Sequence, residues 1–331
     1  MLRAGIDDAL TTPTVLLVLL AVAFAWSMGA HYTGACMGMP RALHAIGPWK
    51  ALFLMAPLVV LGAALASHGV ERTVAERITV RPLPTAAEIV VLAVAFSLTA
   101  AYNRLRLPTS TIQILVFSLV GTAIGDADGV HWRTVALLVV VWALAPIVAA
   151  ALGYVSTRAL DRLPALTAKV TRRKGKVTAW LLVAVGAGAS FAMGANDVSN
   201  ASGALVSSHR FSFLAAGLVG GVGLALGVVT WGRPLLDRIA FEIVKLDGSM
   251  AVAAQGVQAL VVLLAVAFGF FTSMNQALVG AMAGAGAARG RETVDRRVVV
   301  AIARGWLLGP AAGIGAGWAV TRLVALAGVR M

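Results

Sequence analysis

The stretch Gly194-Ala195-Asn196-Asp197-Val198-Ser199-Asn200-Ala201 places an acid and two amides directly after a long apolar run. The other acidic residues of the chain lie in loops or at the ends of apolar runs. An ionised side chain at the centre of a membrane helix costs about 2.5–3.5 kcal/mol on insertion scales, so such a residue usually faces a cavity or a partner. Asp197 therefore predicts a functional site inside an apolar protein.

The rest of the chain is too apolar for a soluble domain. Hydrophobic residues make up 60% of the 331 positions and charged residues only 12%, whereas soluble domains carry about 25% charged residues. We expect an all-α polytopic membrane protein with about 10–12 membrane segments, some of them short or re-entrant helices. The long apolar runs are 13–30, 51–67, 86–101, 135–156, 177–193, 211–231, 251–271 and 298–319, and the shorter ones are 112–124 and 277–288.

Charge and motifs exclude several classes of protein. The net charge of +13 would suggest nucleic acid in a soluble protein, but here the basic residues lie in short loops and set topology instead. The single cysteine, Cys36, cannot form an intramolecular disulfide. No metalloprotease, serine-hydrolase, nucleotide-binding or paired-cysteine motif is present, so we expect neither an enzyme nor a cofactor.

The chain repeats itself at nearly one spacing. Trp26-Ser27-Met28-Gly29-Ala30 matches Phe191-Ala192-Met193-Gly194-Ala195, and Pro108-Thr109-Ser110-Thr111-Ile112-Gln113 matches Phe271-Thr272-Ser273-Met274-Asn275-Gln276. Further matches pair Trp142 with Trp306, Pro146 with Pro310 and Arg158 with Arg322. The offsets are 165, 163 and 164 positions. We therefore predict a first transmembrane repeat at 1–160 and a second at 178–331.

The linker at 161–177 sets the predicted orientation. It holds six Lys or Arg residues against one acid, Asp161, so the positive-inside rule makes it cytoplasmic. Both termini are poorer in positive charge and are predicted to be external. A first half that crosses an odd number of times and a second half that returns form inverted-topology repeats, the architecture of many secondary transporters. We expect a multi-pass protein of the cell membrane, specifically a bacterial plasma membrane.

Residues 194–201, called the acid-amide stretch below, have the chemistry of a cation site. Asn196, Asp197 and Asn200 offer one carboxylate and two amide oxygens, a hard-ligand set suited to Na+, with Asp197 as the metal ligand, or to a proton. Flanking glycines would permit a broken helix at Gly186, Gly188, Gly194 and Gly203. The alternative is an Asx cap at a helix start.

Two polar segments have the chemistry of an anion site. Hydroxyls and amides at the start of a short helix form a seat for a tetrahedral oxyanion, although plain N-capping is the alternative. Their placement at equivalent points of both repeats favours the anion site. The candidate anion ligands are Thr109, Ser110, Thr111 and Gln113 in the first half and Thr272, Ser273, Asn275 and Gln276 in the second.

The first half has no acid at the position equivalent to Asp197. His31-Tyr32-Thr33 occupies the place of Asn196-Asp197-Val198. A histidine at membrane depth is a candidate proton carrier, but His31 more simply serves as a satisfied interior donor, the interpretation that we favour.

These residues resemble the signatures of the inorganic phosphate transporter (PiT) family. The stretch 194–201 is similar to that family's GANDVANA motif, 108–113 to its P-x-S-T-T-H motif, and 243–255 to its second-half loop and following helix. The resemblance implies a cation-coupled symporter with inverted repeats. It also implies that Asn196, Asp197 and Asn200 bind cations, and that Thr109, Ser110, Thr111, Thr272 and Ser273 bind the anion.

Departures from the family pattern leave the substrate open. The first-half signature is replaced by Gly29-Ala30-His31-Tyr32-Thr33-Gly34-Ala35-Cys36, and Gln113 and Gln276 stand where the family has histidine. Loss of the first Asn-Asp pair resembles the family's bacterial sulfate permease branch. Phosphate gains from an acceptor such as a carboxylate, whereas a sulfate site should contain only donors.

The leading hypothesis is import of inorganic phosphate by symport with Na+ or H+. The alternatives are a sulfate permease, a passive anion channel, and a scaffold with a vestigial site. Polar residues gather near the midpoints of the apolar runs instead of forming a continuous stripe, which favours an occluded site over a channel. The expected partners are phosphate or sulfate and the lipid bilayer, without nucleic acid; a homodimer is left open.

Overall fold

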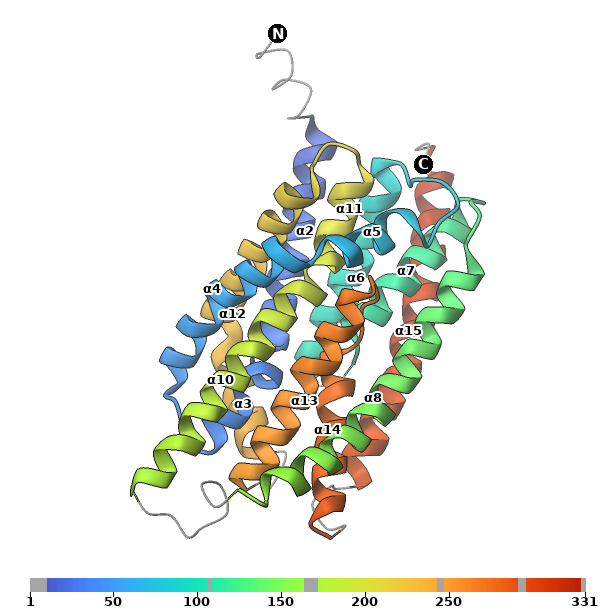
Figure 1. Cartoon of the computed structure of the whole chain (residues 1–331). Coiled ribbons are helices and arrows are strands. Elements are labelled where there is room, and N and C mark those ends of the chain that lie inside the picture. Colours follow the sequence, from blue (N-terminus) through green and yellow to red (C-terminus); the bar gives the residue numbers. More distant parts are fainter. Residues whose placement is uncertain (1–10, 106–108, 164–171, 243–246, 291–295, 329–331) are drawn as a thin grey trace.

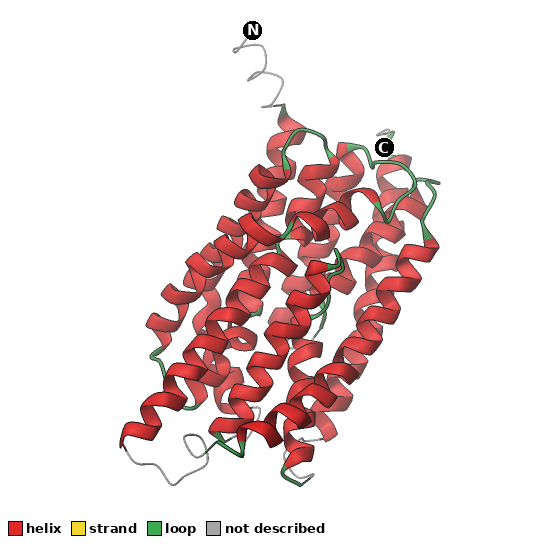
Figure 2. Cartoon of the chain, viewed as in Figure 1, coloured by secondary structure: helices red, strands yellow, loops and turns green. Residues whose placement is uncertain are grey.

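The chain folds into a bundle of helices, seen in a computed structural model that describes residues 11–105, 109–163, 172–242, 247–290 and 296–328 (Figures 1 and 2). Apart from one isolated bridge between Thr79 and Val130, the regular structure in these ranges is helical. The helices are α2 (Thr12–His31), α3 (Thr33–Ala42), α4 (Pro48–Ala66), α5 (His68–Glu76), α6 (Thr85–Leu105), α7 (Thr111–Gly125), α8 (Trp132–Leu160), α10 (Arg172–Asp197), α11 (Ser199–Ser207), α12 (Phe213–Glu242), α13 (Gly248–Ala267), α14 (Met274–Ala288) and α15 (Arg296–Leu326).

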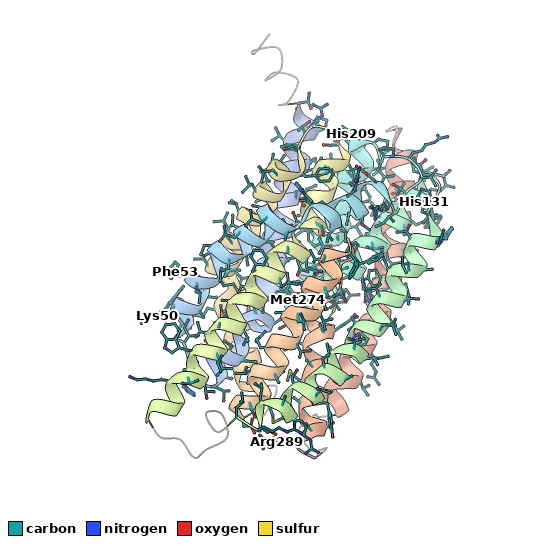
Figure 3. The ribbon with its side chains drawn as sticks, in the orientation of Figure 1. Lys50, Phe53, His131, His209, Met274 and Arg289 are labelled. Atoms are coloured by element: carbon teal, nitrogen blue, oxygen red, sulfur yellow. The ribbon has the colours of Figure 1, made fainter. Side chains whose placement is uncertain are left out.

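Within the described ranges, eight helical segments are long and apolar enough to cross a membrane, and they match the eight long runs of the sequence. Two of them join consecutive helices, α2 with α3 and α10 with α11. Large apolar side chains cover the outside of the bundle: Phe53 is 61% exposed and Trp180 is 75% exposed (Figure 3). Such a surface suits lipid and not water. The predicted 10–12 segments are reached only if α7 and α14, of 15 residues each, are counted.

The two halves pack against each other through exchanged pairs of helices. α2 packs on α12 and α10 packs on α4; likewise α7 packs on α15 and α14 packs on α8. The backbones touch at glycines: a Cβ on Gly29 would lie 2.0 Å from the Leu224 carbonyl oxygen, and one on Gly194 would lie 2.0 Å from that of Val59. Gly29 and Gly194 are 165 positions apart, and so are their partners Val59 and Leu224. The same contact therefore occurs twice, once with the glycine in the first half and once with it in the second. Small residues allow this close approach in membrane bundles.

The ends of the bundle group different parts of the chain. α2 starts and α15 finishes at one end, and α8 finishes and α10 starts at the other (Figure 1). At that second end Arg289 pairs with Asp161 at 2.5 Å and with Asp247 at 3.1 Å, which ties the ends of α8, α13 and α14 together. Residues 164–171 of the predicted linker, the termini and Pro108 lie outside the described residues.

The two short helices begin inside the bundle. Figure 3 shows Met274, the first residue of α14, midway along the bundle, and Arg289, just after its last residue, at one end. α7 runs from the middle toward the opposite end (Figure 1). The starts of α7 and α14, with their free backbone N–H groups, therefore lie at mid-depth.

Candidate functional site

The acid-amide stretch lies where one long helix passes into a short one. α10 ends at Asp197 and α11 begins at Ser199. Val198 between them keeps helical dihedral angles (φ −59°, ψ −35°), so the predicted break is an interruption of hydrogen bonding and not an unwound segment. The corresponding interruption in the first half is at Tyr32, between α2 and α3, where φ is −94° and ψ is 1°.

Asn196 joins this stretch to the start of α14. Its Nδ2 donates to the Thr272 carbonyl oxygen at 2.8 Å, and the Thr272 amide donates to its Oδ1 at 3.0 Å. Both residues are fully buried. The pair of bonds fixes the second-half acid-amide stretch beside the second-half hydroxyl segment, although 76 positions separate them.

Asp197 and Asn200 carry three buried oxygens that have no hydrogen-bond partner among the described residues. These are both carboxylate oxygens of Asp197 and the amide Oδ1 of Asn200, while Nδ2 of Asn200 contacts the Met28 sulfur at 3.4 Å. Buried polar atoms without partners are rare in proteins. Carboxylate and amide oxygens are ligands for hard cations, so the three oxygens have the chemistry of a cation site or of a protonated acid.

The two hydroxyl segments are helix starts, as their sequences predicted. Ser110 caps α7 by accepting from the Gln113 amide at 3.5 Å, and Ser273 caps α14 by accepting from the Gln276 amide at 3.4 Å. In the described part of the chain, the buried hydroxyls of Thr109 and Thr272 have no partner. N-capping thus occurs at both segments, and it leaves the hydroxyls of Thr109 and Thr272 available as donors beside the two caps.

Gln113 and Gln276 bring the two helix starts together. With the Gln276 amide oriented to match its neighbours, its Oε1 accepts from Gln113 Nε2 and from Trp306 Nε1, each at 3.2 Å. The matching tryptophan of the first half, Trp142, donates from Nε1 to the Phe271 carbonyl at 2.9 Å. The predicted anion segments of both halves therefore meet at the centre of the bundle.

The first-half counterpart is occupied by side chains that satisfy one another. His31 Nδ1 lies 2.5 Å from Asn103 Oδ1, and its Nε2 lies 3.2 Å from Asn275 Nδ2. One acceptor and one donor match a neutral imidazole, which agrees with a satisfied interior histidine. The Tyr32 hydroxyl lies 2.7 Å from Thr111 Oγ1, so this position contacts the predicted anion segment of its own half.

Two buried acids were missed by the sequence reasoning. Glu71 is 0% exposed and Glu88 is 3% exposed, although both lie near the ends of apolar runs. Ser202 is 2.6 Å from Glu71, and burial raises the pKa of Glu71 to about 7. The helical spacing could have indicated this burial. Glu71 lies four positions after the small residue Ser67 and three positions before the apolar Val74, so the three residues share one helical face.

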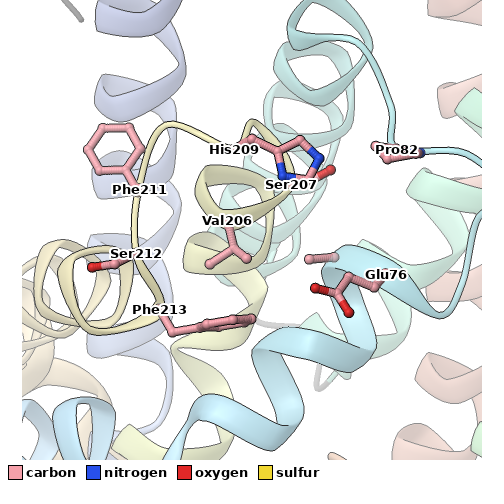
Figure 4. A pocket seen from close by; sticks show the side chains of 9 residues that line it. Glu76, Pro82, Val206, Ser207, His209, Phe211, Ser212 and Phe213 are labelled. Atoms are coloured by element: carbon pink, nitrogen blue, oxygen red, sulfur yellow. The ribbon is translucent and has the colours of Figure 1, made fainter. Parts of the chain in front are cut away.

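A surface pocket lies apart from the predicted site residues. Its lining includes Glu76 of α5, Ser207 of α11, His209 of the following link and Phe213, the first residue of α12 (Figure 4). None of the predicted cation or anion ligands lines it. The predicted cation ligands Asn196, Asp197 and Asn200 are instead fully buried in the bundle.

Known proteins share both the sequence pattern and the fold. A model of the phosphate transporter family matches residues 28–317. The sulfate permease CysP of Bacillus subtilis is 28% identical over 88% of this chain and 83% of its own length. A protein described as a probable low-affinity inorganic phosphate transporter of Mycobacterium leprae is 28% identical over 89% of this chain and 74% of its own length.

A solved structure, "The sodium-dependent phosphate transporter", superposes with a TM-score of 0.86 at 22% identity, covering 96% of this chain and all of that one. It establishes the fold of a multi-pass membrane protein. The family model spans nearly the whole chain, including both acid-amide positions and both hydroxyl segments. On these grounds the chain belongs to the phosphate transporter family, whose members are transporters and not enzymes.

Proposed function

We propose that the protein is a secondary active transporter that imports inorganic phosphate by symport with a cation, Na+ or H+. The observation that carries the proposal is the double hydrogen bond between Asn196 and Thr272. It holds the unpartnered oxygens of Asp197 and Asn200 next to a helix start that suits an oxyanion. A cation bound there offsets anion charge in a low-dielectric site, and its entry is driven by the inward-negative potential that opposes anion entry.

The roles of individual residues follow from this arrangement. Asn196, Asp197 and Asn200 bind the cation, with Na+ favoured by the sodium dependence named for the solved relative. The backbone N–H groups at the starts of α7 and α14 bind the anion together with nearby side chains. Those side chains are Thr109, Ser110, Thr111, Gln113, Thr272, Ser273, Asn275 and Gln276.

The halves 1–160 and 178–331 act as inverted repeats on either side of a cytoplasmic linker at 161–177. The exchanged contacts of α2 with α12 and of α10 with α4 support this assignment. So do Gly121 and Gly284, at which a Cβ would lie 2.3 Å and 1.8 Å from the carbonyl oxygens of Ile314 and Ala150 respectively. Alternating access arises when one repeat rocks against the other around the central site.

Sulfate is the second candidate substrate. The first half has no acid at its signature position, and a donor-only site suits sulfate because sulfate cannot donate a hydrogen bond at neutral pH. The sulfate permease among the relatives supports this alternative. Asp197, which could accept a hydrogen bond from phosphate, supports the leading one.

The test is uptake of labelled phosphate and of labelled sulfate into proteoliposomes, each under a Na+ gradient and under a pH gradient. We expect phosphate uptake that saturates and disappears when the driving gradient is dissipated. Sulfate uptake without phosphate uptake would reject the phosphate assignment. A conductance that does not depend on either gradient would reject symport in favour of a channel.

A further inference from the structure

A second buried carboxyl lies outside the candidate site, on the short helix α5. Glu71 is 0% exposed; its Oε1 lies 2.6 Å from Ser202 Oγ, and its Oε2 has no hydrogen-bond partner among the described residues. Ser202 is on α11, five positions after Asp197. An ionised carboxylate is costly to bury without compensation, so Glu71 needs either a positive partner or a proton.

No positive partner is present on α5 in the described part of the chain. The guanidinium of Arg72 pairs with Glu76 at 3.0 Å on the exposed side of α5. His68 packs its ring edge against Phe213. Neither residue forms an ion pair with Glu71, so its own helix supplies no charge to balance it.

The helices packed against α5 supply no positive partner either. α11 and α13 contain no titratable residue. On α12 the residue beside Glu71 is Gly217, and the described titratable side chains, Arg233 and Asp237, are at least four helical turns further on. Glu88 of α6 is another acid, and its hydrogen bond is to Ser207. The helices packed against α5 therefore bring no described positive charge to Glu71, and burial raises its pKa more than the hydrogen bonds of Ser202 and Ser67 lower it.

The Ser202 hydroxyl has more acceptors in reach than it has hydrogens, because its Oγ can donate either to Glu71 Oε1 at 2.6 Å or to the Val198 carbonyl. Ser202 Oγ lies 3.0 Å from the Val198 carbonyl, and Ser67 Oγ lies 2.5 Å from the Ala63 carbonyl. A serine has one hydroxyl hydrogen, and when it bonds the carbonyl of its own helix, the oxygen remains as an acceptor. A protonated Glu71 completes this network by donating. Burial also raises the pKa of Glu71 to about 7.

α5 touches both segments that carry the candidate site. Through Ser202 it contacts α11, which continues from Asp197. Through Thr73, whose Oγ1 donates to the Gly269 carbonyl at 2.7 Å, it contacts the link that leads to Thr272. A change at Glu71 can therefore reach the cation and the anion segments together.

We propose that Glu71 is a proton-binding site of the transport cycle, protonated while α5 packs on α11 and releasing its proton to water when the two helices part. The proposal rests on the proposed transport function and makes H+ a ligand at a residue distinct from Asp197. The packed state binds more protons than the open state between the ordinary pKa of glutamate and about 7. Its stability should therefore fall as the pH rises through that window.

The first test needs no transport. Infrared difference spectra of the full chain in liposomes, between about pH 5 and about pH 9, should contain the carbonyl band of a buried carboxylic acid that titrates near neutral pH. Glu71→Gln should lose that component, and the matched control Glu76→Gln, on the exposed side of the same helix, should keep it. An unchanged band in Glu71→Gln overturns the proposal. Should Glu71→Gln not fold, Glu71→Asp must shift the titration, and an unshifted titration overturns the proposal too.

The second test follows protons during uptake. Proteoliposomes with an entrapped pH dye should show proton entry together with labelled phosphate or sulfate for the unmodified protein and for Glu76→Gln. Glu71→Gln should lose the anion-dependent proton entry; undiminished proton entry in this variant overturns the assignment of Glu71. Absence of all anion uptake by the unmodified protein rejects the transport function instead, and the infrared result then decides Glu71 separately.

Discussion

Residues 29–36 and 194–201 occupy equivalent places in the two halves and differ in how their polar groups are satisfied. In the first half, His31 and Tyr32 bond to Asn103, Asn275 and Thr111. In the second half, Asp197 keeps both carboxylate oxygens without a described partner. The backbone contacts are nevertheless alike, since Gly29 and Gly194 each touch a facing helix. The packing is thus alike in the two halves, whereas only the second half has an acid at this position, with oxygens that lack a described partner.

The largest effect should come from removing the charge of Asp197. Asp197→Asn keeps the shape but loses the anionic ligand, and bonds to charged groups contribute about 1.5–3 kcal/mol. Since about 1.4 kcal/mol is a factor of ten, cation affinity should fall by about tenfold to a hundredfold, and gradient-driven uptake should be lost. Melting temperature should stay the same or rise, because a buried unpaired charge disappears.

Labelled-anion uptake and thermal unfolding of the purified protein measure these two effects of Asp197→Asn. The control is Asp128→Asn, in the loop between α7 and α8, which should transport normally. Full uptake by Asp197→Asn would contradict the assignment of a cation site to the second half.

The next prediction tests whether the close helix contacts at Gly29 and at Gly194 are equivalent in the two halves. A Cβ at Gly29 or Gly194 would lie 2.0 Å from a carbonyl oxygen, so each glycine-to-alanine change must separate two helices. We expect Gly29→Ala and Gly194→Ala to cost about 3 kcal/mol each, at the upper end for overpacking. Gly188→Ala, where the nearest atom would be 4.0 Å away, is the matched control. Unequal losses in thermal unfolding would show that the halves differ in packing as well.

The sequence predicted the features that depend on local chemistry. The eight long apolar runs coincide with the eight candidate spans of the described residues, because a bilayer sets the required length. Ser110 and Ser273 cap helices because capping involves only neighbours. The bonds of Asn196 to Thr272 and of Gln113 to Gln276 join distant positions, and no local pattern encodes them. Glu71 was missed because its burial depends on α11 and not on its own polar segment.

A smaller effect should follow from loss of the Asn196 bonds, which join the second-half acid-amide stretch to the start of α14. Asn196→Ala removes two hydrogen bonds and leaves the buried Thr272 amide without its acceptor, a loss of about 2 kcal/mol in stability. Because Thr272 also starts the anion segment, the KM for the anion should rise. Asn275→Ala, which loses one contact of a half-buried side chain, should cost less. An unchanged KM in Asn196→Ala would contradict the link between the cation and anion segments.

The smallest effect should come from Tyr32, which stands where the second half has its acid. Tyr32→Phe loses one hydrogen bond to Thr111, so unfolding should become easier by about 1 kcal/mol. A double-mutant cycle with Thr111→Val should recover a coupling of the same size, about 0.5–1.5 kcal/mol, because the two side chains are in direct contact. Gradient-driven uptake should persist in Tyr32→Phe, since its hydroxyl serves packing and not cation binding. If Tyr32→Phe instead lost uptake as fully as Asp197→Asn, the first half would still carry a functional site at this position, with a phenol in place of a carboxylate.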